Sequence, residues 1–244
     1  MTDLHTHILP GMDDGARDVP TALAMLRQQR KQGVDRVALT PHFYRDEESP
    51  ERFFARRARA WDKLSQAMAQ SEEGFPDLVL GAEVCWVPGI HRWEAPERFC
   101  LGNSPYLLLE LPDTPWRTSM FDQIYDLMDS SEVIPILAHV ERYFRTQKAE
   151  HIRELFRMGV PLQVSAAPML RLLERGSVLR RVGDNPNCFL ISDCHDLTNR
   201  VPNLGPGMAQ IEKRLGADRA ADMRALSREI FRRAAQKEDH HASK

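Results

Sequence analysis

The chain has 244 residues, of which 42% are hydrophobic and 28% charged, enough for one large domain or two small ones around a sizeable core. A formal net charge of −2 excludes a global basic field that would attract nucleic acid or anionic membranes. No apolar run approaches the roughly 18 residues of a membrane span, and Asp3 and His5 stand where a signal peptide needs a basic start and an apolar block. We therefore expect a soluble cytoplasmic protein with no nucleic-acid partner and no membrane insertion.

Short apolar runs alternate with longer amphipathic stretches along the chain. In chain order, strands are expected at residues 2–8, 35–40, 77–84, 106–111, 133–138, 160–164 and 188–192. Helices are expected at residues 19–32, 50–71, 116–129, 149–158, 168–182, 207–215 and 218–235. Ser49 followed by Pro50 is typical of a helix start, and Gly33 and Gly159 are typical of helix ends.

This alternation predicts an α/β fold built from parallel βα units. Seven units in about 240 residues favour a (β/α) barrel with slightly fewer than eight strands over a doubly wound open sheet. No repeat, low-complexity segment or linker divides the chain, so residues 1–235 are expected to form one domain. The polar residues 236–244 are expected to form a disordered tail.

Side chains suited to metal binding fall at the ends of the predicted strands. His5 and His7 are two residues apart on the first strand, so their imidazoles point to the same face. Asp13 and Asp14 lie in the loop that follows. The later strand ends supply His42, Glu83, Glu110, His139, Asp193 and His195. Because (β/α) barrels place their active sites at this edge, we expect these groups to meet.

So many buried ionisable groups would be costly to pack without a cation. Divalent ions neutralise carboxylates and bind neutral imidazoles, and about nine ligands fit two or three ions better than one. Such centres most often hydrolyse phosphoesters, because the ions lower the pKa of bound water so that hydroxide can attack phosphorus. Arg142 and Arg200 lie close in sequence to ligands and could hold phosphate with their planar guanidinium groups.

The order of these candidates resembles the signature of the PHP (polymerase and histidinol phosphatase) superfamily. The resemblance is carried by Asp3-Leu4-His5-Thr6-His7, Thr40-Pro41-His42, Gly81-Ala82-Glu83, Ala138-His139 and Ser192-Asp193-Cys194-His195. Three further segments resemble the bacterial manganese-dependent protein-tyrosine phosphatases of capsule and exopolysaccharide gene clusters. These segments are residues 9–16, Leu109-Glu110-Leu111-Pro112 and Ala138-His139-Val140-Glu141-Arg142-Tyr143.

The resemblance implies a distorted (β/α)7 barrel of the PHP type with three divalent ions, Mn being favoured over Fe, Zn and Mg. It assigns His5, His7, Glu83 and Asp193 to the first ion. It assigns Glu83, Glu110 and His139 to the second ion. The third ion takes His42, His195 and one carboxylate of the Asp13–Asp14 pair, for which Asp14 is favoured. Arg142, Arg200 and Asp14 are the implied catalytic residues, and the two arginines bind the substrate phosphate.

The implied function is a metal-dependent phosphatase that hydrolyses phosphotyrosine. Its implied substrate is the Tyr-rich tail of a membrane-associated tyrosine autokinase that controls capsular or exopolysaccharide synthesis. Two alternatives stay open: a phosphatase for small monoesters such as histidinol phosphate, and a catalytically silent domain that uses the ions for stability alone. The loop Phe43-Tyr44-Arg45 departs from the loops of that family, which leaves substrate entry open.

Residues Cys194 to Arg200 also satisfy the C-x5-R pattern of cysteine-dependent tyrosine phosphatases. The neighbouring Asp193 and Asp196 carboxylates would raise the pKa of the Cys194 thiol and repel phosphate. No glycine in this loop allows the backbone to wrap around an anion. We therefore expect Cys194 to be a small buried residue, and the four cysteines (Cys85, Cys100, Cys188 and Cys194) to be thiols.

Overall fold

The computed structural model describes residues 1–236 of the chain. Within this range nine short strands form two sheets, in the orders β1-β2-β4 and β3-β5-β6-β7-β8-β9, and every pairing is parallel. The strands are β1 (Thr2–Asp3), β2 (Arg36–Leu39), β3 (His42–Phe43), β4 (Asp77–Leu80), β5 (Glu83–Cys85), β6 (Tyr106–Glu110), β7 (Ile134–Leu137), β8 (Leu162–Ser165) and β9 (Cys188–Ile191). The predicted α/β class with parallel strands is confirmed.

The strand predicted at 35–40 is followed after Pro41 by a separate short strand, β3, and the strand predicted at 77–84 is divided into β4 and β5, which gives nine strands where seven were expected. The first division falls at Pro41, which has no N–H to donate. Backbone hydrogen bonds still cross the break, because Gly81 N donates to Leu39 O at 2.9 Å and Glu83 N donates to Pro41 O at 3.0 Å. The two halves of each run therefore stay paired in parallel while they pass from one sheet to the other.

The first predicted strand, residues 2–8, is shorter than expected and continues as an isolated bridge between Thr6 and Cys194. Around it, Asp193 N donates to His5 O at 3.1 Å and His7 N donates to Cys194 O at 2.9 Å. Residues 5–7 thus lie beside the segment that follows β9. This pairing joins the first and last strand runs of the chain.

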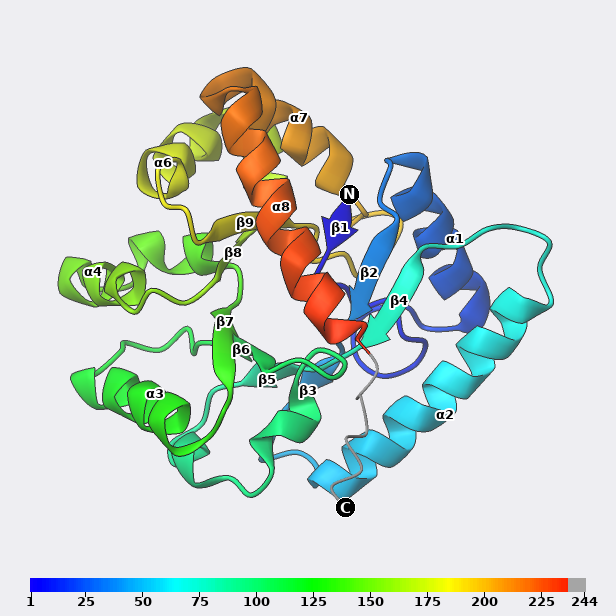
Figure 1. Cartoon of the computed structure of the whole chain (residues 1–244), viewed down its shortest axis with the longest axis horizontal. Coiled ribbons are helices and arrows are strands. Elements are labelled where there is room, and N and C mark those ends of the chain that lie inside the picture. Colours follow the sequence, from blue (N-terminus) through cyan, green and yellow to red (C-terminus); the bar gives the residue numbers. More distant parts are fainter. Residues whose placement is uncertain (237–244) are drawn as a thin grey trace, which may run out of the picture.

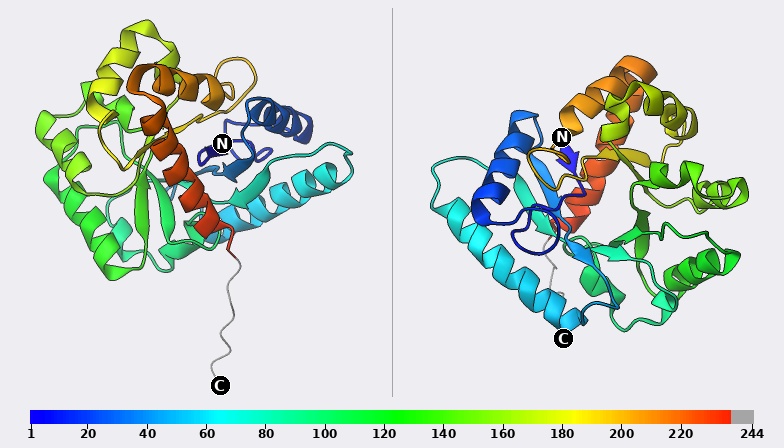
Figure 2. Two further views of the ribbon diagram at one scale, coloured as in Figure 1. Left: turned by 45° about the horizontal axis from the view of Figure 1, so that its top comes forward. Right: turned by 180° about the vertical axis from the view of Figure 1, so that it is seen from behind.

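Helices surround the strands, and α8 crosses in front of them in Figure 1. They are α1 (Val19–Lys31), α2 (Pro50–Ala69), α3 (Thr118–Ser130), α4 (Ala149–Arg157), α5 (Ala167–Leu170), α6 (Leu172–Val182), α7 (Leu204–Leu215) and α8 (Ala217–Ala234). Short 3-10 turns occur as η1 (Ile90–Arg92), η2 (Pro96–Phe99) and η3 (Val140–Arg145). Seen from behind, the loop after β1 lies in front of the strands, on the side opposite α8 (Figure 2).

Two helix predictions need correction. The helix expected at 168–182 is interrupted at Arg171, whose extended backbone separates α5 from α6. The helix expected at 207–215 begins earlier, at Leu204, and its first turn packs Leu204 and Gly207 into the core. Within residues 1–236, none of the helices is both long and apolar enough for a bilayer crossing. The predicted tail at 236–244 lies, apart from Gln236, outside the described residues.

The end of α8 packs closely against the turn before β6. Gly102 has a φ of +51°, and a Cβ placed there would lie 2.0 Å from the carbonyl oxygen of Ala234. Asn103 N donates to the same oxygen at 3.1 Å. The turn therefore requires glycine for its backbone conformation and also for the close approach of the helix.

We expect Gly102→Ala to lower the free energy of unfolding by about 3 kcal/mol, because left-handed strain adds to a backbone clash. Gly159→Ala is the matched control, since Gly159 has a φ of +72° but no described atom within 4 Å of an added Cβ. It should cost only about 1 kcal/mol. Urea unfolding of both variants measures the difference, and equal losses would contradict the close packing of α8.

Candidate metal centre

Glu83, at the start of β5, is fully buried and lies at the middle of a cluster of histidines. Its Oε2 is 3.0 Å from His5 Nε2, 3.2 Å from His7 Nε2 and 3.0 Å from His42 Nδ1. Its Oε1 is 2.8 Å from His139 Nε2. One carboxylate is thus in contact with four imidazoles from three segments of the chain.

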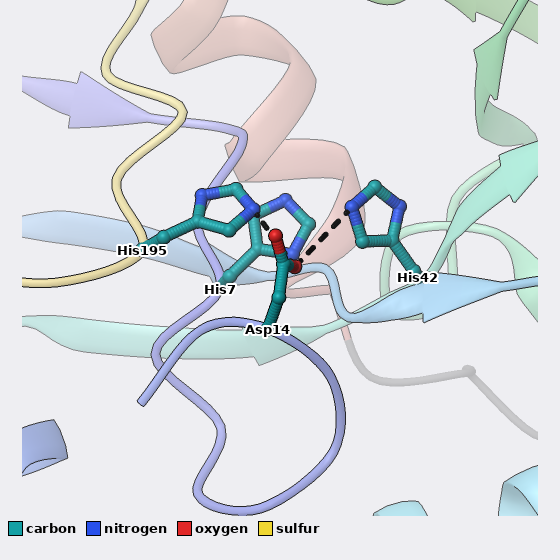
Figure 3. A group of neighbouring side chains, drawn as sticks. All are labelled: His7, Asp14, His42 and His195. Atoms are coloured by element: carbon teal, nitrogen blue, oxygen red, sulfur yellow. Dashed lines mark ion pairs between the residues drawn. The ribbon is translucent and has the colours of Figure 1, made fainter. Parts of the chain in front are cut away.

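Asp14 lies at the exposed side of this cluster, between two of its histidines. Its Oδ1 is 3.3 Å from His195 Nε2 and 3.7 Å from His42 Nε2, as drawn by the dashed lines in Figure 3. The His195 ring stacks on that of His7, with 3.7 Å between centroids. Together, His7, Asp14, His42 and His195 offer ligand atoms within 4.8 Å of one another.

Two arginines approach the cluster through Asp193, which follows β9. Arg200 Nη2 lies 2.8 Å from both oxygens of the Asp193 carboxylate, and Arg142 Nη2 donates to Oδ2 of the same group. Asp193 Oδ1 is also 3.6 Å from Nε2 of both His5 and His7. The arginines are therefore held at the edge of the histidine cluster by a carboxylate that also faces it.

Polar side chains behind the cluster orient two of the imidazoles. His5 Nδ1 lies 2.8 Å from Gln163 Oε1, and His7 Nδ1 lies 2.7 Å from Asp13 Oδ2. Both oxygens are acceptors, so in the neutral, metal-binding form each histidine carries its hydrogen on Nδ1 and has the lone pair on Nε2, on the side of Glu83. This is the tautomer in which Nε2 can bind a metal ion.

Asp13 and Asp14 are adjacent in sequence but have different roles in the site. Asp13 accepts from His7 and from the backbone N–H of His42 at 2.9 Å, whereas Asp14 faces the histidine pair at the opening. The loop is tightly packed, because a Cβ at Gly15 would lie 2.1 Å from His7 O. The geometry therefore puts Asp14 in position for an ion and puts Asp13 behind a histidine.

Two residues of the cluster have unusual backbone conformations. His139 has a φ of +30° and Asp193 a φ of +53°, both outside the regions that ordinary residues prefer. Each follows a strand, β7 or β9, and the left-handed turn directs its side chain to the cluster. Strain of this kind, on the order of 1–3 kcal/mol per residue, persists where the surrounding structure enforces it.

The charges in the cluster depend on one another. Burial opposes protonation of His7, but the Asp13 and Glu83 carboxylates outweigh it and raise its pKa to about 10. Burial likewise opposes protonation of His139, while Glu110 and Glu83 raise its pKa to about 9. Burial would raise the pKa of Glu83, yet His5 and His139 hold it well below its usual range. The carboxylates therefore remain ionised and attract positive charge to this place.

Several buried atoms of the cluster have no hydrogen-bond partner among the described residues. They are His42 Nδ1, Glu83 Oε2, His139 Nδ1 and His195 Nε2. Glu83 Oε2 has three imidazole nitrogens within 3.2 Å, but none of these contacts has hydrogen-bond geometry. Lone pairs that converge without hydrogen bonds fit divalent cations bound by imidazole and carboxylate. The residues present thus suit a metal centre.

The structure brings all nine predicted ligands together. The candidate groups that can hold an ion contain, between them, His5, His7, Asp14, His42, Glu83, Glu110, His139, Asp193 and His195. Their division differs from the expected one, since His42 groups with Glu83 and Glu110, and His139 with His5 and Glu83. The tail histidines, His240 and His241, lie outside the described residues.

Sequence reasoning missed two side chains that shape the site. Gln163 is a polar residue between Leu162 and Val164 in the buried strand β8, which was the available signal. Tyr44, in the loop that departs from the family pattern, stacks on His42 with 5.1 Å between ring centroids. The stack places an aromatic ring beside the opening of the metal centre.

Cys194 is fully buried beside the metal centre, so its thiol is not accessible to bind a substrate phosphate. Burial and the nearby Asp3 carboxylate raise the pKa of its thiol well above the ordinary value. Gln29 donates to Asp3 Oδ2 at 2.6 Å and to Cys194 Sγ at 3.6 Å, which fills the space behind the thiol. All four cysteines of the chain are free thiols. The geometry opposes the cysteine-dependent mechanism.

The fold and the site define an α/β protein of the class that carries a buried imidazole–carboxylate metal centre at the ends of parallel strands. The chain belongs to the family described as "Capsular polysaccharide synthesis, CpsB/CapC", whose sequence model matches residues 1–229.

Curated relatives and solved structures agree with this membership. The tyrosine-protein phosphatase CpsB of Streptococcus pneumoniae is 27% identical over 239 residues, covering 91% of this chain and 94% of CpsB. The tyrosine-protein phosphatase YwqE of Bacillus subtilis is 27% identical over 228 residues, covering 89% and 86%. A crystal structure from work on these two proteins, described as unique metal-dependent tyrosine phosphatases, matches with a TM-score of 0.82 at 25% identity, covering 96% of this chain and 95% of that one.

We expect Gln163→Leu to weaken manganese binding about 10- to 100-fold, because His5 loses the acceptor that fixes its tautomer and orientation. Gln163→Glu keeps an acceptor for His5 Nδ1 and should retain most of the affinity. Manganese titration followed by calorimetry measures both variants. Equal losses in the two would show that Gln163 acts only by packing.

Proposed function

We propose that this chain is a metal-dependent protein-tyrosine phosphatase, a phosphoric monoester hydrolase that acts on phosphotyrosyl proteins. The observation that carries the proposal is the convergence of nine imidazole and carboxylate side chains, buried Glu83 among them, with two arginines beside them. Membership in the CpsB/CapC family and the tyrosine phosphatases among its relatives support the substrate class. The family description supports a role in capsular polysaccharide synthesis.

The proposal includes three divalent ions, manganese being the favoured metal. The first would be held by His5, His7, Glu83 and Asp193, the second by Glu83, Glu110 and His139, and the third by Asp14, His42 and His195. Short contacts support each set, among them 3.0 Å from Glu83 to His5, 3.3 Å from Glu110 to His139 and 3.3 Å from Asp14 to His195. Glu83 touches members of all three sets, which suits a bridging carboxylate.

When bound, divalent ions polarise phosphoryl oxygens and lower the pKa of water. The protein's own contribution is to bind and orient the phosphoryl group. Arg142 and Arg200 each carry a planar guanidinium group, and both line the space next to Asp193. A phosphoryl group there would accept hydrogen bonds from the two arginines. These bonds would replace part of the hydrogen bonding between the arginines and Asp193. Asp14 Oδ2, 3.5 Å from Arg200 Nη1, connects the histidine pair to this anion site.

We also propose that the parallel strands form a distorted (β/α)7 barrel within a single domain of residues 1–235. The hydrogen bonds that cross the breaks at Pro41 and between β4 and β5 support seven continuous strand runs. The Thr6–Cys194 bridge supports closure of the ring between the first run and the last. The match of the family over residues 1–229 supports one domain.

The substrate protein we propose is the Tyr-rich tail of a membrane-associated tyrosine autokinase, in keeping with a role in polysaccharide synthesis. Such a tail would be reached from the cytoplasm. A reducing compartment agrees with the four free thiols of the chain, two of which, Cys188 and Cys194, have no exposed surface.

Chelation is expected to abolish hydrolysis of a phosphotyrosyl peptide, and added manganese to restore it, because ionised carboxylates and neutral imidazoles hold the ions. Phosphate release before and after EDTA treatment measures this, with metal analysis of the same samples. A panel that includes histidinol phosphate tests the substrate class: a higher kcat/KM on the small monoester would contradict the proposal. Full activity in EDTA would contradict metal dependence.

Cys194→Ser is expected to leave kcat within about twofold, because the buried thiol is protonated and does not face the phosphate site. Glu83→Gln is the contrasting variant and should lower kcat at least about 100-fold by removing the shared charge. Both are measured on the same peptide with metal content determined. Loss of activity in Cys194→Ser with its metal intact would favour a thiolate mechanism instead.

A further inference from the structure

A cavity of about 310 Å³ opens beside the metal centre, and we call it the side pocket. Its walls come from η3, the end of β8, the start of α6 and the loop after β9. Arg142, Asp193 and Arg200 line this pocket and also contact the metal centre. Any group in the side pocket would therefore be a close neighbour of a phosphoryl group held by the two arginines.

Two buried polar side chains line the side pocket without partners among the described residues. Ser165 is 6% exposed and its Oγ makes no hydrogen bond, and Asn203 is 9% exposed and its Oδ1 makes none. Buried polar atoms are almost always paired in native proteins, and leaving one unpaired is costly. The Ser165 hydroxyl can donate to an anion, whereas Asn203 Oδ1 accepts and suits an N–H of the same ligand. Their presence indicates a surface built to receive a polar group.

The charge on the pocket wall points to an anion. Glu141 accepts from Ser165 N at 3.2 Å, and Glu174 lies 3.3 Å from Arg171 Nη1, so both carboxylates are engaged. Arg145 also lines the pocket, and no carboxylate of residues 1–236 lies within 4.0 Å of its guanidinium group. The side pocket thus presents a cation whose charge the surrounding structure leaves unpaired.

The surroundings favour a polypeptide over a free small ion. Leu172 and Leu173, which lie in sequence between the pocket-lining Arg171 and Glu174, are 80% and 92% exposed. Adjacent apolar side chains that are this exposed are typical of surfaces that contact another protein. The pocket volume is at the small end for ligand sites and suits one or two side chains.

We propose that the side pocket is a specificity subsite that receives an anionic side chain, carboxylate or phosphate, close in sequence to the target phosphotyrosine. Arg145 pairs with the anion, the Ser165 hydroxyl donates a hydrogen bond to it, and Asn203 Oδ1 accepts from an N–H of the same peptide segment. The inference rests on the proposed phosphatase function, because it places the phosphotyrosine at Arg142 and Arg200. It makes the enzyme selective for acidic segments of its substrate.

The test uses the full chain with manganese and peptides that carry a non-hydrolysable phosphonate analogue of phosphotyrosine. Within three residues on either side, one position at a time is occupied by Glu, by phosphoserine or by neutral Gln. Fluorescence anisotropy gives each Kd. At the preferred position we expect Glu or phosphoserine to bind about five- to tenfold more tightly than Gln, the range of one net hydrogen bond. The stronger of the two identifies the anion.

Arg145→Gln is expected to remove this preference, and Arg145→Lys to keep part of it. Arg153→Gln, on exposed α4 outside the side pocket, is the matched control and should keep the full preference. Equal affinity for the charged and neutral peptides, or a preference that survives in Arg145→Gln, would overturn the subsite. Hydrolysis of a phosphotyrosyl peptide is measured in parallel. Its absence would refute the phosphatase function, while the Kd comparison still decides the subsite.

Discussion

A fully buried carboxylate surrounded by histidines is the constraint on which the rest of this structure depends. Glu83 has no contact with solvent, so its charge must be balanced by groups that the fold brings to it. Four imidazoles lie within 3.2 Å of its oxygens, and they come from the first segment, β3 and the turn after β7. The segments that carry these histidines must therefore meet at one place, around Glu83.

The groups behind the cluster determine how it can be used. Asp13 and Gln163 hold the hydrogens of His7 and His5 on Nδ1, which leaves Nε2 free to act as a ligand atom. The left-handed backbone conformations of His139 and Asp193 direct these two side chains into the cluster, at some cost in backbone strain. The same contacts thus orient the metal ligands and hold the strand ends together.

The anion site and the side pocket share their walls with this centre. Arg142 and Arg200 meet at Asp193, and the same residues open into the cavity lined by Ser165 and Asn203. A phosphoryl group and a neighbouring anionic side chain would therefore be bound by one continuous set of donors. Recognition of the substrate chain and binding of its phosphate are physically connected in this arrangement.

The sequence by itself determined the parallel α/β class and the positions of the nine ligand candidates, because both follow from local pattern. His5 and His7 share a face through the two-residue repeat of extended chain, and the other ligands follow strand ends. Tertiary structure decided what local pattern does not encode. The division of roles between Asp13 and Asp14 and the contact of Gln163 with His5 depend on residues far apart in the chain. The side pocket likewise exists only where η3, β8, α6 and the loop after β9 pack together. Packing sets the distances and orientations between such segments, and the spacing of residues along the sequence does not predict them.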